Sequence, residues 1–251
     1  MRTCLVALCL WLLATSAGAA DLRNLRMPLA DGGELLYGLS VPDGYVQGRP
    51  LPLVLALHPG GERMVYYGSA YSRAVVAPAL ADLGAIIVAP DCPTNAWTDA
   101  MSERAVLALL ERIFREYTVD RARVLVVGFS MGGRGTWFFS SHHAGLFTAA
   151  IPMAASTGNE PVDTLARVPT YIIHSRRDQV VPFEPAERNA RELERLGRTV
   201  VFDPLDAPTH FEMGAYVPAL RRAGAWVAAR WDAAASPTTP PGGARAPGRQ
   251  D

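Results

Sequence analysis

The sequence contains no lysine, and its 24 basic residues, all of them arginines, balance 24 acidic residues. A mechanism that needs a catalytic or Schiff-base lysine is therefore excluded. The zero net charge argues against a nucleic-acid-binding protein with a broad basic surface, because phosphate binding needs a clustered excess of positive charge. The sequence also lacks zinc-ligand spacing, a phosphate-binding glycine loop and a dinucleotide fingerprint, so we expect neither a metal nor a cofactor.

Cysteine is scarce as well, since the chain has three and two of them lie within the first nine residues. The N-terminal segment has an arginine at position 2, an apolar run over residues 5–13 and small residues at 17–19, which is typical of a signal peptide. The apolar run is short for a bilayer span, so a retained anchor is the weaker alternative. Removal of residues 1–19 would leave Cys92 alone and exclude an internal disulfide. We therefore predict an exported protein, periplasmic or secreted, with no stable membrane anchor after this removal.

The rest of the chain has the length and apolar content of one globular domain, which we place at residues 20–235. Residues 236–251 are rich in proline and glycine and are predicted to form a disordered tail. Between these bounds short apolar runs alternate with amphipathic stretches. Strands are expected at 22–29, 34–41, 53–57, 85–89, 124–127, 149–151, 170–173 and 200–202, and helices at 69–82, 101–117, 131–142, 184–196 and 214–231.

Apolar runs without polar alternation suit central parallel strands that are covered on both faces. Their alternation with helices predicts an α/β fold with a mostly parallel, doubly wound sheet and helices on both faces. In such a sheet functional residues lie in loops at the carboxyl ends of the strands.

The strongest motif follows the predicted strand at 124–127, where Gly128, Ser130 and Gly132 form a G-x-S-x-G pattern before a predicted helix. A sharp turn from strand to helix lifts the serine oxygen out of the sheet and needs neighbours that are nearly without side chains. The same turn leaves the amide of Met131 free at a helix start, where it can face a developing oxyanion. We predict Ser130 as a nucleophile and Met131 as an oxyanion donor.

A serine hydroxyl needs a base to take its proton and a carboxylate to orient that base. His210 lies in a loop before the last predicted helix and is the expected base, whereas His174 ends a strand and is interpreted as packed structure. Asp178 follows the strand at 170–173 and is the expected acid. Asp206 is the best substitute for it, and Asp203 is a further rival near His210.

A second oxyanion donor is expected in the loop after the strand at 53–57, which reads His58-Pro59-Gly60-Gly61. Paired glycines let the backbone approach a substrate oxygen closely. Either Gly60 or Gly61 fits this role, and His58 is interpreted as a structural residue that holds the loop by a hydrogen bond.

These motifs together carry a resemblance to a known family. Residues 124–137 resemble the nucleophile segment of bacterial α/β-hydrolase-fold carboxylesterases, in particular the phospholipase/carboxylesterase and polyhydroxybutyrate-depolymerase-like group, near the dienelactone hydrolases. Residues 171–182 resemble the acid segment of these enzymes, and residues 89–93 with Trp97 resemble a loop beside their active site. The resemblance implies the α/β-hydrolase fold and hydrolysis of carboxylic esters. Ser130, in place of the cysteine of dienelactone hydrolases, points to ester rather than enol-lactone substrates.

Four aromatic residues are candidate walls of a substrate pocket, namely Trp97, Tyr66, Tyr67 and Tyr71, although covering the sheet edge is an equally good interpretation of each tyrosine. About 14 residues separate Ala154 from Val168, where many relatives carry a cap domain, so we expect an open site without a cap. The expected protein is an exported serine carboxylesterase that acts on a small-molecule or oligomeric ester. The alternatives are a serine peptidase of the same fold and a non-catalytic binding protein that retains the fold.

Overall fold

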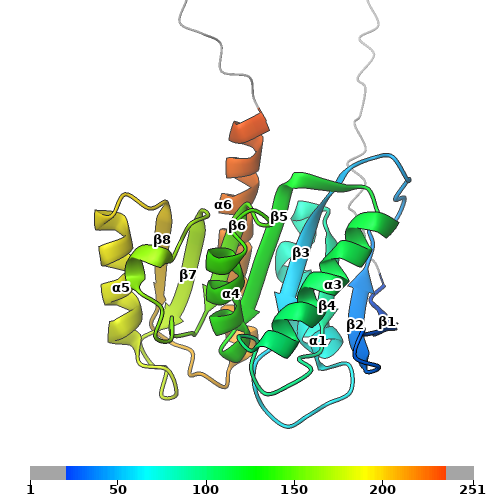
Figure 1. The fold of residues 1–251 in the computed structure, drawn as a ribbon. Helices are drawn as coiled ribbons and strands as arrows, with labels where there is room; N and C mark the ends of the chain where they lie inside the picture. The colour runs from blue at the N-terminus through cyan, green and yellow to red at the C-terminus, as the bar shows by residue number, and fades with distance from the viewer. Residues whose placement is uncertain (1–20, 236–251) are drawn as a thin grey trace, which may run out of the picture.

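The computed structural model describes residues 21–235, so the predicted signal peptide and the predicted C-terminal tail lie outside the described residues. Its eight-stranded sheet has the order β1-β2-β4-β3-β5-β6-β7-β8 (Figure 1). β1 and β2 pair antiparallel and so do β2 and β4, while every other neighbouring pair is parallel. The strands are β1 (Arg23–Pro28), β2 (Glu34–Ser40), β3 (Leu51–Leu57), β4 (Ile86–Pro90), β5 (Val119–Phe129), β6 (Ala149–Met153), β7 (Thr170–Ser175) and β8 (Val200–Leu205). The mostly parallel sheet predicted from the sequence is confirmed.

Helices cover both faces of this sheet. They are α1 (Tyr67–Tyr71), α2 (Ala77–Leu80), α3 (Ala100–Glu116), α4 (Met131–His142), α5 (Phe183–Arg195) and α6 (Val217–Ala235). α3, α4 and α5 lie on the face turned to the viewer in Figure 1, and α6 lies behind the sheet. Within residues 21–235, no helix combines the length and the apolar character that a membrane crossing requires.

The helix predicted over 69–82 is interrupted. α1 passes into a π-helical turn at Ser72–Val76, then into α2 and a 3-10 turn at Ala81–Leu83. Pro78 lies in the first turn of α2. A proline has no backbone N–H and its ring clashes with the preceding turn, so a regular helix cannot run through this position.

The two faces of each central strand pack into different cores. In β3, Val54 and Ala56 contact the core formed with α2 and α6, whereas Leu53, Leu55 and Leu57 contact the core formed with α3. This follows from the alternation of side chains along a strand. All five residues are buried, so the strand is anchored from both sides and its carboxyl end is a fixed point for the loop that follows.

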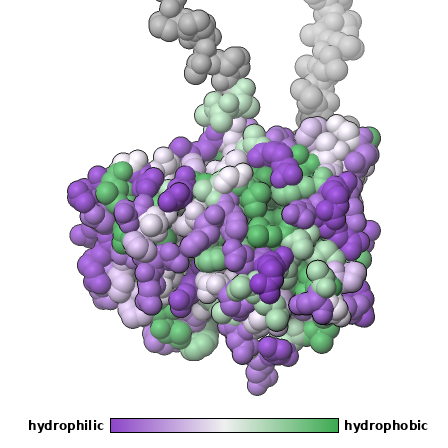
Figure 2. Space-filling model, in the orientation of Figure 1, coloured by the Kyte–Doolittle hydropathy of each residue, from purple (hydrophilic) through white to green (hydrophobic). Residues whose placement is uncertain are grey.

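α4 lies unusually close to β3 because three of its positions are glycines. A Cβ atom at Gly132 would overlap the carbonyl oxygen of Leu57, and one at Gly135 would lie 2.6 Å from the Cβ of Trp97. A Cβ atom at Gly133 would lie 2.6 Å from the carbonyl oxygen of Met153 in β6. The first turn of α4 is therefore held directly above the carboxyl ends of β3 and β6. Hydrophilic side chains cover much of the surrounding surface of this face (Figure 2).

We expect Gly132→Ala to lower the free energy of unfolding by roughly 3 kcal/mol, because the added methyl group must push α4 away from the backbone of β3. Urea denaturation of the variant measures this loss. Gly145→Ala is the matched control, since no atom lies within 4 Å of a Cβ at Gly145 and its stability should change little. Equal stability of the Gly132 variant and the control would contradict the close approach of α4.

Candidate active site

The turn between β5 and α4 holds Ser130 in a strained conformation. Its backbone angles are φ 54° and ψ −114°, in a region that residues other than glycine rarely adopt. The amide of Ser130 donates to the carbonyl of Met153 at 2.9 Å, and its carbonyl accepts from the amide of Arg134 at 2.9 Å. These bonds hold the strained turn in place and direct the serine side chain out of the sheet.

Ser130, His210 and Asp178 meet in one hydrogen-bonded chain. His210 Nε2 lies 2.9 Å from Ser130 Oγ, and His210 Nδ1 lies 2.8 Å from Asp178 Oδ2. The other oxygen of Asp178 accepts from the amides of Val180 and Val181 at 2.9 and 2.8 Å. The Asp178 side chain is fully buried, so these three bonds offset the loss of its hydration. The structure thus brings together the three side chains that the sequence indicated.

The two alternative candidates for the acid, Asp206 and Asp203, contact other residues. Asp206 is largely exposed and forms an ion pair with Arg176 at 3.2 Å. Asp203 accepts from Tyr171 at 2.9 Å and pairs with Arg222 at 2.7 Å. Neither carboxylate has a hydrogen bond to a histidine among the described residues.

His174 is packed structure, as interpreted from the sequence, but it packs against the acid itself. Its Nε2 donates to the carbonyl of Val181 at 3.0 Å and lies 3.6 Å from Asp178 Oδ2. Burial lowers the pKa of His174, which keeps its ring neutral beside the carboxylate. His174 therefore packs beside the same oxygen of Asp178 that binds His210.

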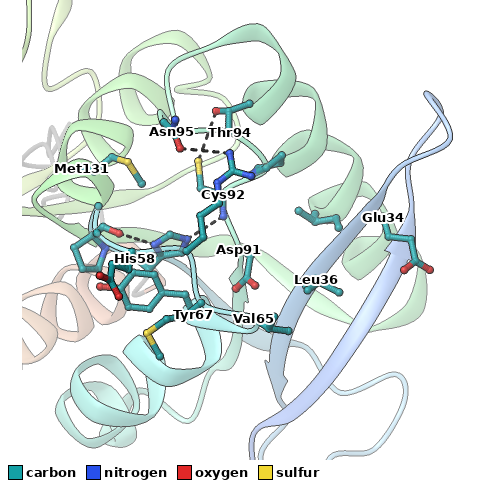
Figure 3. Close-up of a pocket in the computed structure, with 18 residues that line it drawn as sticks. Glu34, Leu36, His58, Val65, Tyr67, Asp91, Cys92, Thr94, Asn95 and Met131 are labelled. Atoms are coloured by element: carbon teal, nitrogen blue, oxygen red, sulfur yellow. Dashed lines mark hydrogen bonds between the residues drawn. The ribbon is translucent and has the colours of Figure 1, made fainter.

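His58 joins the loop after β3 to the loop after β4. Its Nε2 accepts from the amide of Cys92 at 2.9 Å, so the ring proton is on Nδ1, which donates to the carbonyl of Pro59 at 2.6 Å (Figure 3). The carbonyl of His58 accepts from the indole N–H of Trp97 at 3.0 Å. Burial lowers the pKa of His58 to about 4. The neutral ring therefore holds Pro59 in one orientation at ordinary pH, which is the structural role expected for it.

The hydrogen bond from His58 to the Pro59 carbonyl helps to decide which of Gly60 and Gly61 donates to the oxyanion. In a trans peptide the C=O and N–H groups point in opposite directions, so fixing the Pro59 carbonyl on His58 turns the Gly60 amide away from the ring. A Cβ at Gly60 would lie 3.7 Å from the side chain of Met131, which places Gly60 beside the first residue of α4. Gly61 is further along the loop, with a φ of 149° and with Tyr67 as its neighbour. The arrangement favours Gly60 as the partner of Met131.

Two cavities meet at Met131. One, of about 430 Å³, is lined by His58, Gly60, Tyr67, Cys92 and Met131 among others (Figure 3). The other, of about 420 Å³, is lined by Trp97, Ser130, Met131 and Arg134 among others. A molecule with its reacting bond at Ser130 can therefore extend in two directions.

Of the aromatic candidates, Trp97 lines the cavity at Ser130, although the residue is only 1% exposed. Tyr66 lines neither cavity. Its amide donates to Asp91 Oδ2 at 2.6 Å, and its backbone is left-handed with φ 59°. The neighbouring Tyr67 lines the larger cavity instead, with its ring centroid 4.5 Å from that of His58. Tyr71 is buried in the core, so Tyr67 is the one of the three candidate tyrosines that lines either of these two cavities. The sequence left the choice among them open, because it gave no sign that Asp91 fixes this turn.

Residues 21–235 hold no group of three or more histidine, cysteine, aspartate or glutamate side chains with the geometry of a metal site. The sheet order, together with the Ser130–His210–Asp178 arrangement, places the chain in the α/β-hydrolase fold class.

Comparisons with known proteins agree with this class. The PETase family model, described as PET hydrolase-like, matches residues 71–191, slightly less than half of the chain. Feruloyl esterase C of Emericella nidulans is 28% identical over 158 residues, which cover 59% of this chain and 56% of that protein. Probable feruloyl esterase C of Aspergillus flavus is 27% identical over 181 residues, which cover 68% of this chain and 65% of that protein. The chain thus spans less than two thirds of the length of these relatives.

Solved structures of esterases also resemble this chain. A thermostable esterase matches with a TM-score of 0.71 and 26% identity, over 83% of this chain and 63% of that chain. A ferulic acid esterase matches with a TM-score of 0.71 at 17% identity, over 83% of this chain and 98% of that chain, which shows the likeness of fold. The expected resemblance to α/β-hydrolase-fold carboxylesterases is confirmed.

The protonation of His58 should make stability depend on pH. Its pKa lies below the ordinary value of 6.5 in the folded state, so the unfolded chain binds more protons between about pH 6.5 and 4. We therefore expect this contribution, roughly 3 kcal/mol, to be complete above pH 6.5 and to be lost as the pH falls toward 4. His174, whose pKa is also lowered, contributes with the same sign.

Urea denaturation of wild type and His58→Gln at pH 7, 5.5 and 4.5 measures this effect. The variant should be less stable at pH 7 but should lose less stability on acidification. An identical pH dependence in the two proteins would show that His58 is not the titrating group.

Proposed function

We propose that the chain is a serine esterase that hydrolyses carboxylic esters through a covalent acyl-enzyme. The observation that supports this most strongly is the chain of two hydrogen bonds from Ser130 Oγ through His210 to the buried carboxylate of Asp178. A serine held this way has a base within reach of its proton and an acid that keeps the base in the right tautomer.

In the first half of the reaction Ser130 Oγ attacks the ester carbonyl while its proton passes to His210 Nε2. Asp178 keeps the Nδ1 proton on the ring and stabilises the imidazolium that forms. The tetrahedral oxyanion lies between the amides of Met131 and Gly60, which donate to it. Collapse of this intermediate releases the alcohol, which takes the proton from His210 Nε2, and leaves the acyl group on Ser130.

In the second half His210 Nε2 takes a proton from water, and the resulting hydroxide attacks the acyl carbonyl. The same two amides stabilise the second oxyanion. Its collapse breaks the bond to Ser130 Oγ, which regains the proton from His210, and the carboxylic acid leaves. No other group is needed for the proton balance.

The substrate we propose is a small-molecule or oligomeric ester, with one side of the scissile bond in each cavity. The rings of His58 and Tyr67 give the larger cavity an aromatic wall. Since the curated relatives carry the name feruloyl esterase, a feruloyl ester belongs in the first substrate panel beside acetyl, butyryl and hydroxybutyrate esters. We also propose that residues 1–19 direct export, on the strength of their apolar run and small residues.

We expect Ser130→Ala to lower turnover of p-nitrophenyl butyrate by roughly 10⁴-fold or more while the protein stays folded. A fluorophosphonate probe should label the wild type at Ser130 and leave the variant unlabelled. Ser141→Ala is the matched control on the same helix, because its buried hydroxyl has no hydrogen-bond partner among the described residues. It should keep both turnover and labelling. Unchanged ester cleavage by Ser130→Ala would refute the assignment.

The same assays separate the alternative functions. A serine peptidase would cleave peptide p-nitroanilides at rates that rival its rates on p-nitrophenyl esters. A non-catalytic binding protein would show no fluorophosphonate labelling of Ser130 in the wild type. The proposal requires labelling together with a strong preference for esters.

The chain between β6 and β7 bears on how substrates enter. Residues 154–169 contain one short 3-10 turn, Val162–Thr164, and no longer helix. We therefore expect ester turnover to rise smoothly with substrate concentration through the solubility limit of a triglyceride such as tributyrin. A sharp increase above that limit would indicate an element that opens at a lipid interface.

A further inference from the structure

The two cavities that meet at Met131 differ in charge. The larger one is lined by three acidic residues, Glu34, Glu62 and Asp91, and by one basic residue, Arg63. The carboxylate of Glu34 is paired with Arg26 at 3.3 Å. The cavity at Ser130 is lined by one charged side chain, that of Arg134. A substrate that spans both cavities therefore meets negative charge on one side of Ser130 and positive charge on the other.

Arg134 is placed by the nucleophile's own helix. It follows Ser130 by four residues, which is about one helical turn, or about 6 Å along the axis. Its amide donates to the carbonyl of Ser130, so the two residues belong to one rigid turn. The guanidinium has no hydrogen bond and no ion-pair partner among the described residues, although it offers five donors.

The loop after β6 leaves space for this side chain. Gly158 has a φ of 69°, and a Cβ atom there would lie 2.9 to 3.1 Å from the guanidinium atoms of Arg134. The guanidinium of Arg134, an exposed residue, therefore lies beside Gly158, where a larger residue would crowd it. Glu160 of that loop lines a smaller cavity together with Arg134, but its carboxylate contacts His142 Nε2 at 3.3 Å and has no hydrogen bond to Arg134.

We propose that Arg134 binds a carboxylate group of the substrate, so that the enzyme prefers esters with a carboxylate a few bonds from the scissile bond. This rests on the proposed esterase function and narrows its substrate class. A guanidinium and a carboxylate form two parallel hydrogen bonds, which makes Arg134 suited to this group in geometry as well as in charge. The acidic residues of the other cavity outnumber its one arginine, so the charged end of the substrate is favoured on the side of Arg134.

Matched pairs of esters test this preference. The first pairs are the monoethyl esters of succinic, glutaric and adipic acid against ethyl butyrate, pentanoate and hexanoate, in which a methyl group stands where the acid has its carboxylate. A second set places the carboxylate on the alcohol, with 4-(butyryloxy)butanoate against butyl butyrate. Product release by chromatography gives kcat/KM for each ester, and the ratio within a pair is the readout.

We expect the charged ester to be favoured in at least one pair by roughly tenfold, the size expected of one charge-assisted contact that is partly open to water. Arg134→Gln should bring the ratio in that pair to one or below, and Arg134→Lys should restore part of it. The preference should also shrink as salt is raised from 0.02 to 0.5 M. Arg115→Gln is the charge-matched control, because Arg115 lies in the last turn of α3, where the chain enters the amino end of β5. It should leave the ratio unchanged.

The outcomes separate the two proposals. If the wild type hydrolyses the neutral esters but shows a ratio near one in every pair, the role of Arg134 is wrong and the esterase function stands. A preference that survives in Arg134→Gln also contradicts the role of Arg134. If the wild type hydrolyses neither member of any pair and p-nitrophenyl butyrate is stable as well, the esterase function itself fails.

Discussion

The interaction on which the site depends is the contact between the buried carboxylate of Asp178 and the ring of His210. A carboxylate without exposure to water is costly unless its lone pairs are occupied, and here two backbone amides and Nδ1 of His210 occupy them at 2.8 to 2.9 Å. Since the amides belong to the turn after β7, the carboxylate is fixed to the sheet. His210, at the end of a loop, is in turn fixed by the carboxylate, and this brings its Nε2 to Ser130.

The oxyanion side of the site is held by a separate set of contacts. His58 ties the loop after β3 to the loop after β4 through Cys92, and Trp97 donates to its carbonyl. α4 meets the same region through glycines that allow backbone contact with β3. Both halves of the site are thus attached to the carboxyl ends of central strands, whose side chains are buried on both faces. This is how a fixed geometry arises from residues that lie far apart in the sequence.

Much of this could be predicted from the sequence, because the governing signals are local. Short apolar runs predicted strands that the structure contains, and the spacing of Gly128, Ser130 and Gly132 predicted the nucleophile turn. Features that depend on contacts between distant segments could not be predicted from the sequence. Which of the candidate tyrosines lines the cavity is decided by Asp91 of the loop after β4, which fixes the turn that carries Tyr66 and Tyr67. The free guanidinium of Arg134 is visible only once its surroundings are known, although its position one turn after the nucleophile was a usable signal.

A mutant cycle on His210 and Asp178 tests the central claim most directly. The two residues act as one unit, so kcat/KM for p-nitrophenyl butyrate in the double alanine variant should fall about as far as in His210→Ala alone. Two losses that multiply in the double variant would show that the residues act independently. That result would contradict the proposed proton relay.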